Sequence, residues 1–270
     1  MFGFSKRARR AKHSRARRQL GNRLRLQHLE ERRLLTVAPS FNPLEFPALD
    51  TVDVSENTAD KPQSKIWQHD DHWWSVLPQD TGTWLWRLDN TTWNPVLQLS
   101  ANKNVHADVK ADGNLAHVLL FDSDNTQFRS LEYVPGNQPT YQHWSLQSNL
   151  VDVALDSGVE TATFDIDSTG RLWLASDESD FIEVRYADAP YTSFSSPIVV
   201  GSGISGDDIS TITAFDNNKI GVFWSNQTTE RFGFRYHVDG TSPTVWSADE
   251  MPVTESMSTS GGGLADDHLN

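Results

Sequence analysis

The chain of 270 residues contains no cysteine, so disulfide bonds and thiolate metal sites are excluded. It also lacks an apolar run of the roughly 20 residues that a membrane-spanning helix requires, and its mean hydropathy is −0.52. No phosphate-binding loop, dinucleotide-binding fingerprint or nucleophile elbow occurs in it. These absences remove several enzyme classes but do not fix a compartment.

Positive charge is scarce after residue 35. Residues 1–35 hold 12 of the 23 Lys and Arg against two acids, a net charge of +10, whereas the remainder has 11 basic and 34 acidic residues, a net charge of −23. An acidic body repels nucleic acid and anionic membranes, so we expect no nucleic-acid partner for it. Only the basic arm could bind nucleic acid, which we keep as a second alternative function.

What the chain does have is a repeat of about 50 residues. The aromatic residues Trp93, Trp144, Phe194 and Trp246 follow one another at steps of 51, 50 and 52, and Arg185-Tyr186 recurs as Arg235-Tyr236. A fixed period of this length is typical of stacked supersecondary units, and it suits the four short strands of a propeller blade. Asp112-Gly113 and Asp239-Gly240 stand where tight hairpin turns need a positive φ.

The sequence therefore predicts an all-β, β-propeller-like repeat of four-stranded blades. In the third copy we expect Phe194–Val200 as the outermost strand, and in the fourth copy Ser210–Phe215 as the innermost and Thr244–Trp246 as the outermost strand. We expect a basic segment over 1–38, a Pro-rich linker over 39–63 and the repeat domain over 64–270. The predicted blades and the start of a fifth are 64–99, 105–147, 160–200, 208–249 and 264 onward. A chain that stops in the first strand of a fifth blade would leave an open edge, so an incomplete ring is expected.

The basic arm carries the pattern Leu29-Glu30-Glu31-Arg32-Arg33-Leu34-Leu35 after a Lys/Arg-rich start. Over residues 1–40 it resembles the LEPR-XLL type of N-terminal export segment of planctomycete surface proteins, with Glu31 where that family usually has Pro. The resemblance implies an exported, extracellular or cell-surface protein and no particular activity. Its sorting residues would be Leu29, Glu30, Arg32, Leu34 and Leu35. An unspecific cationic tail is the plainer interpretation.

Acidic residues at the blade junctions are the candidate ligand-binding set. Glu160 lies 12 residues before Leu172, as Asp208 does before Ile220, and such junctions fall at one mouth of a propeller channel. The candidates are His106, Asp108, Glu160, Asp208, Asp267 and His268. Clustered carboxylates can bind a cation or a polyol, or act as an acid/base pair, but they also cap loops.

No cofactor and no metal site are predicted from the remaining motifs, apart from the calcium that two turns leave open. Asp165-Ile166-Asp167-Ser168-Thr169-Gly170 resembles the start of a calcium loop but lacks its later carboxylate, and Asp122-Ser123-Asp124 is a weaker version. Calcium is the one ion these turns leave open, with a plain hairpin as the alternative. His69-Asp70-Asp71-His72 alternates between two faces of a strand, which splits the set.

The predicted function is an exported binding or interaction module, with carbohydrate or another surface protein as its partner. Most Trp residues of the first copy should fill the space between blades, and one or two could stack on sugar rings. The enzyme alternative is a sialidase-like propeller glycoside hydrolase with an incomplete site, which would use an arginine cluster and a Tyr/Glu pair. Residues of those types are Glu183, Arg185, Tyr186, Arg235 and Tyr236. No catalytic residue is assigned, and the question of enzyme activity is left open, leaning towards none.

Overall fold

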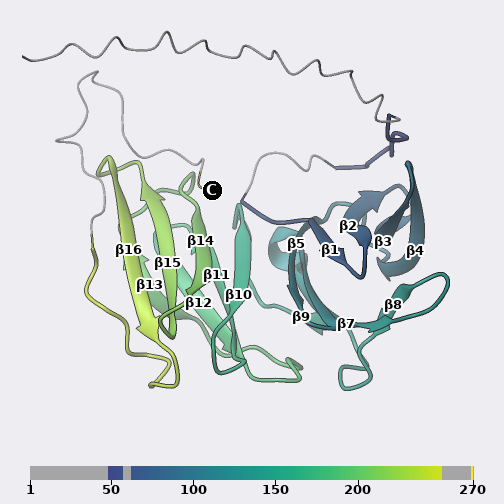
Figure 1. Ribbon diagram of the computed structural model, residues 1–270. Coiled ribbons are helices and arrows are strands. Elements are labelled where there is room, and N and C mark those ends of the chain that lie inside the picture. Colours follow the sequence, from purple (N-terminus) through teal and green to yellow (C-terminus); the bar gives the residue numbers. More distant parts are fainter. Residues whose placement is uncertain (1–47, 57–61, 251–268, 270) are drawn as a thin grey trace, which may run out of the picture. The chain divides into compact units, whose positions relative to one another are not determined.

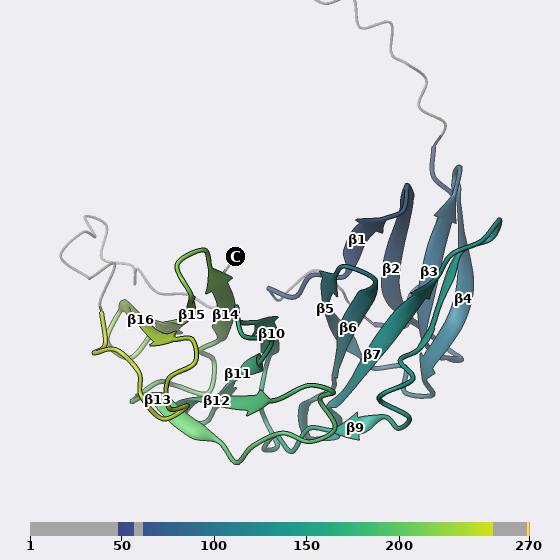
Figure 2. The ribbon, with the colours of Figure 1, turned by 60° about the horizontal axis from the view of Figure 1, so that its bottom comes forward.

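The computed structural model describes residues 48–56, 62–250 and 269 of the chain. Within them, sixteen strands form antiparallel sheets, and one short 3₁₀ turn, Ser123–Asn125, connects two of the strands. Figures 1 and 2 show the strands of each sheet side by side in chain order. No helix of the described residues is long and apolar enough to cross a membrane.

The first and second sheets are meanders whose turns use residues that tolerate a positive φ. Asp70 and Asp71 join the first two strands at φ 49° and 60°, and Gly113 turns the second sheet at φ 56°, which confirms the predicted Asp-Gly turn. The first sheet consists of β1 (Ile66–His69), β2 (His72–Gln79), β3 (Gly82–Asp89) and β4 (Thr92–Ser100). The second consists of β5 (His106–Asp112), β6 (Leu115–Phe121), β7 (Gln127–Val134) and β8 (Thr140–His143), with β9 (Val151–Asp152) also paired to β7.

The third and fourth sheets repeat the same order. Gly170, at φ 85°, makes the turn after the first strand of the third sheet, and Gly240, at φ 75°, follows the last strand of the fourth. The third sheet consists of β10 (Ala162–Ile166), β11 (Leu172–Glu178), β12 (Phe181–Ala187) and β13 (Ile198–Ser202). The fourth consists of β14 (Ser210–Phe215), β15 (Lys219–Asn226) and β16 (Arg231–Val238).

Both faces of the inner sheets are buried against neighbouring sheets. In β11, Leu172 and Leu174 join a core with the second sheet, while Trp173 and Ala175 join a core with the fourth. Successive side chains of a strand point to opposite faces, so one strand supplies two cores. A sandwich would leave one face of each sheet polar, whereas face-to-face stacking of consecutive four-stranded meanders is the packing of propeller blades. The fold is therefore all-β and propeller-like, as predicted.

Carboxylates tie the innermost strands of consecutive sheets together. Asp108 in β5 accepts the N–H of Ser64 at 2.7 Å and that of Phe164 in β10 at 3.0 Å. Asp165 in β10 accepts the N–H of Ala214 in β14 at 2.9 Å. Each carboxylate thus accepts a backbone donor from the innermost strand of the next sheet, and the N–H of the buried Phe164 would otherwise lack this partner.

Three details differ from the prediction. The fourth sheet has three strands in the described residues, because residues 244–246 form no strand and the following segment pairs only through an isolated bridge between Phe234 and Glu250. The outer strand of the third sheet begins at Ile198, not at Phe194. Of the Trp residues in the first copy, Trp67, Trp74 and Trp86 are buried, whereas Trp73 is 46% exposed.

Candidate functional site

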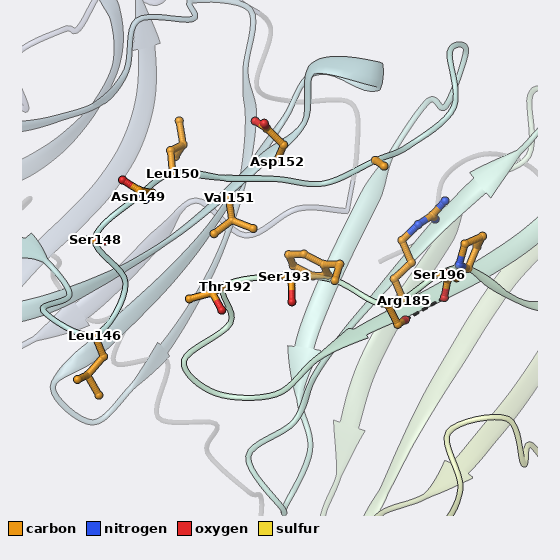
Figure 3. A pocket seen from close by; sticks show the side chains of 14 residues that line it. Leu146, Ser148, Asn149, Leu150, Val151, Asp152, Arg185, Thr192, Ser193 and Ser196 are labelled. Atoms are coloured by element: carbon orange, nitrogen blue, oxygen red, sulfur yellow. Dashed lines mark hydrogen bonds between the residues drawn. The ribbon is translucent and has the colours of Figure 1, made fainter.

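A cavity of about 670 Å³ lies between two irregular segments of the second and third sheets. One wall is the segment from Leu146 to Asp152 with Ala154, the other is the segment from Thr192 to Pro197, and Arg185 of β12 also lines the space. Figure 3 shows the side chains of both walls and of Arg185. The volume falls within the range of small-molecule sites.

Gln147 holds the two walls in register. Its side-chain oxygen accepts the N–H of Ser130 in β7 at 2.6 Å, and its amide nitrogen donates to the carbonyl of Tyr191 at 2.8 Å. Because Gln147 is fully buried, these bonds fix the first wall to its own sheet and to the segment that leads into the second wall. Sequence reasoning missed this residue, since a glutamine between two strands carries no pattern that reveals its partners.

The second wall is held to β12 by Ser195. Its N–H donates to the carbonyl of Tyr186 at 2.8 Å, and its hydroxyl accepts the N–H of Tyr186 at 3.1 Å. Ser247 makes the same two bonds with Tyr236 in the fourth sheet. The pairs Phe194-Ser195 and Trp246-Ser247 therefore mark where a connecting segment is hydrogen-bonded to the third strand of its sheet.

Arg185 and Asp152 are the charged residues of the cavity lining, and Arg185 is the buried one. Its side chain is 5% exposed and lies 3.2 Å from a carboxylate oxygen of Glu183 and 3.6 Å from one of Glu178. Burial, followed by the nearby Asp156 and Glu183 charges, raises the pKa of Glu178 to about 7, and burial also raises the pKa of Glu183. One guanidinium thus faces two carboxylates, so the charge of Arg185 is balanced within the protein.

Hydroxyl and amide groups make up much of the remaining lining. The polar uncharged residues around the space are Ser148, Asn149, Thr192, Ser193, Ser195 and Ser196, and Asp152, which accepts a hydrogen bond from Gln127 at 2.9 Å, adds a carboxylate. Phe194 supplies an aromatic ring, half-buried, whose inner side meets Phe128 edge-on at 5.7 Å. Hydroxyls that donate and accept, beside an aromatic ring, suit a ligand that is itself rich in hydroxyl groups.

The acids predicted at the blade junctions are engaged with the protein backbone. Asp208 is fully buried and accepts the N–H groups of Ser205 at 2.7 Å and Gln227 at 2.9 Å, so it fastens the turn before β14. Asp108 is the inter-sheet tie described above, and burial raises its pKa to about 6 against the lowering effect of its backbone donors. Both acids therefore have structural roles.

Two of the other candidates lie at the start of an innermost strand, and two lie outside the described residues. His106 begins β5, 3.8 Å from Glu56, and the N–H of Glu160 just before β10 donates to Asp177 at 2.9 Å. Asp267 and His268, like the sorting residues 29–35, lie outside the described residues. None of the four candidates that the structure describes lines the 670 Å³ cavity.

The calcium-like sequence forms a hairpin turn between β10 and β11. One oxygen of Asp167 accepts the N–H groups of Thr169 and Arg171, and the other accepts the indole N–H of Trp173 at 2.9 Å. Burial alone would raise the pKa of Asp167, but these hydrogen bonds lower it. Among the residues that the structure describes, no group of three or more His, Asp or Glu is arranged to hold a metal ion; calcium binding stays a prediction.

The residues named for a sialidase-like site point in different directions. Arg185 is opposite Leu174 in the ladder, on the face towards the second sheet, whereas Tyr186 is opposite Trp173 and packs on the other face at 5.5 Å from it. Arg235 and Tyr236 belong to the fourth sheet. Of the five residues, only Glu183 and Arg185 are paired.

No family model and no curated protein matches the chain. Similar solved structures include a thermostable family-43 glycoside hydrolase, with 10% identity and a TM-score of 0.38 over 68% of this chain and 70% of that one. An α-L-arabinofuranosidase from Lactobacillus brevis has 11% identity and a TM-score of 0.41 over 67% and 70%. The polysaccharide lyase Uly1 has 10% identity and a TM-score of 0.44 over 74% and 56%. These values are too low to transfer a substrate, and the propeller-like assignment is based on the stacked sheets themselves.

Proposed function

We propose that this chain is an exported module that binds a carbohydrate in the cavity between the second and third sheets. The observation that carries the proposal is the lining: hydroxyl and amide groups on both walls, the Phe194 ring and a charge-balanced Arg185. A neutral polyol can exchange hydrogen bonds with such groups without burying an unpaired charge. The resemblance of residues 1–40 to an export segment supports a location where free glycans occur.

The test is a glycan array with the full chain, followed by calorimetric titration of the best ligand. Ser193→Trp should abolish binding, because Ser193 is an exposed wall residue and an indole there fills the cavity. Ser242→Trp is the matched control, an exposed serine outside the cavity lining, and should bind like the wild type. The proposal fails if no glycan binds or if both variants bind equally.

A glycoside hydrolase is the second candidate, and one observation favours it. Glu178 and Glu183 share one guanidinium and both have raised pKa values, which is the kind of carboxylate pair that glycoside hydrolysis uses. A fluorogenic glycoside screen of the wild type and of Glu178→Gln decides between the two candidates. Glycan binding without turnover in the wild type removes the enzyme, and turnover that Glu178→Gln abolishes supports it.

A further inference from the structure

A second, smaller cavity of about 180 Å³ lies between β13 of the third sheet and β16 of the fourth. Its lining is residues 199–202 with Arg231, Arg235 and Asp249. The two arginines are four residues apart on one strand, so they share a face. Arg235 is opposite Val222, which belongs to the core with the third sheet, so that face is directed towards the third sheet.

Polar atoms of all three charged side chains are buried here without a hydrogen-bond partner among the described residues. They are Nε of Arg235, Nη1 of Arg231 and Oδ1 of Asp249. Arg231 and Asp249 are joined through their other atoms at 2.8 Å. Asp249 therefore balances one guanidinium, and no ion pair to Arg235 occurs within the described part of the chain. A buried charged donor without an acceptor is costly.

The internal repeat shows what Arg235 lacks. Arg235 is the counterpart of Arg185, which has Glu178, Glu183 and Ser176 around it. By strand register, the counterparts of these three residues are Asn226, Gly233 and Trp224.

Gly233, which stands where the third sheet has Glu183, has no space for a side chain. The ring of Trp224 lies against Gly233, where an added Cβ would come within 2.1 Å of ring carbons. Both carboxylates of the third sheet are thus replaced by groups without charge, while the arginine is kept.

We propose that this cavity binds the oxyanion group of an acidic ligand, a carboxylate or a sulfate. Arg235 provides a positive charge that no carboxylate of the described residues pairs with, and Arg231 provides a second donor on the same side. Guanidinium groups bind such oxyanions through charge-assisted, often paired hydrogen bonds. The volume is below that of a site for a whole small molecule, so it fits a single anionic group of a larger ligand. This site is independent of the carbohydrate cavity.

The experiment titrates the full chain with sodium sulfate and, separately, with sodium acetate at constant ionic strength maintained with sodium chloride. Binding is followed by calorimetry. Arg235→Gln should weaken binding about 10-fold or more, the loss of one charge-assisted hydrogen bond. Arg171→Gln is the control, because Arg171 is already saturated by Asp188 at 2.7 Å and lies outside this cavity. The stronger of the two salts identifies the oxyanion.

A second variant keeps the test informative if Arg235→Gln does not fold. Asp249→Asn removes the carboxylate that competes for the guanidinium groups, so it should strengthen sulfate or acetate binding. An effect of opposite sign from the arginine variant is not expected from general destabilisation. Failure of both salts to bind, equal loss in Arg171→Gln and Arg235→Gln, or weaker binding in Asp249→Asn would each overturn the proposal.

Discussion

Two glycines of the fourth sheet are explained by the aromatic rings that pack against them. The ring of Trp224 lies over Gly233, and the rings of Phe215 and Phe234 lie over Gly221, so these glycines are spaces filled by aromatic neighbours and not points of backbone freedom. Neither glycine has a positive φ. Substitution of either glycine should therefore destabilise the fold through steric overlap with these rings and not through backbone strain.

Gly233→Ala should therefore lower the free energy of unfolding by about 1–3 kcal/mol or more, because the new methyl group would overlap the Trp224 ring. Gly136→Ala is the matched control, since nothing lies within 4 Å of a Cβ built there. Urea unfolding of both variants measures the difference. Equal stability of the two would contradict the packing explanation.

His117 should make stability depend on pH in a defined window. Burial lowers the pKa of His117 to about 4 from 6.5, so the folded protein takes up its proton less readily than the unfolded chain. Stability from this group is present above pH 6.5 and is lost as the pH falls towards 4, by up to about 1.4 kcal/mol per pH unit.

His117→Phe removes this titration, and the change is measured as the difference in unfolding free energy between wild type and variant. That difference should move by about 1–2 kcal/mol in the variant's favour between pH 6.5 and pH 5. The buried acids Asp108 and Asp177, whose pKa values are raised to about 6, have the opposite slope, but they are present in both proteins and cancel. A constant difference across this range would show that His117 does not titrate this way.

At the scale of single elements, strand alternation decides which aromatic residues carry stability. Trp74 in β2 is fully buried, meets the Tyr141 ring edge-on at 4.9 Å and donates to the carbonyl of His69. Its neighbour Trp73 points to the other face and is 46% exposed. Two adjacent residues of the same type thus have different environments.

Trp74→Ala should cost about 3–5 kcal/mol of unfolding free energy, the range for loss of a buried aromatic side chain. Trp73→Ala should cost about 1 kcal/mol or less, because nearly half of its surface is already in contact with water. Thermal and urea unfolding of the pair test this directly. If Trp73→Ala proves the more damaging of the two, the strand is in the opposite register.

Strands could be predicted where pattern and turn chemistry agree, and not where tertiary contacts decide. The span Ser210–Phe215 is found as predicted, because alternation and flanking turn residues mark both of its ends. The predicted fourth strand of that sheet was wrong. Residues 244–246 are held by hydrogen bonds of Ser247 to Tyr236 and of the Trp246 indole to Pro243, and not by a strand ladder. The cavity walls were missed because they belong to segments without periodicity, held by the buried Gln147.

Two acids of the site prediction accept backbone hydrogen bonds in the structure, which the sequence does not reveal. Asp108 and Asp208 stand out in the sequence only as carboxylates beside apolar residues. Their acceptor role depends on Phe164, 56 residues after Asp108, and on Gln227, 19 residues after Asp208. A sequence repeat shows which positions are equivalent but not which hydrogen-bond donors surround them. An acid that holds a loop and an acid that binds a ligand therefore cannot be told apart from the sequence.

At the scale of the whole molecule, three separate cores hold consecutive pairs of sheets together. Leu85 belongs to the core of the first and second sheets, and Val222 to that of the third and fourth. Stacked units of this kind are stabilised by nearest-neighbour contacts, so local damage should spread unevenly.

Leu85→Ala should therefore increase hydrogen exchange in β2, β3 and β6 more than in β15. Val222→Ala, the matched change in the other core, should give the reverse distribution. Exchange followed by mass spectrometry measures both variants. A uniform increase across all sheets in either variant would show that the stack opens as one cooperative unit.

The tie made by Asp108 has a consequence for synthesis of the protein. Its carboxylate receives one hydrogen bond from a residue 44 positions earlier and another from a residue 56 positions later. On a ribosome that adds 5–20 residues per second, the later donor emerges about 3 to 11 s after Asp108 itself. During that interval the nascent second sheet holds a half-satisfied acid that water must solvate. Docking of each new sheet then completes the one before it, so the order of translation is also the order of assembly.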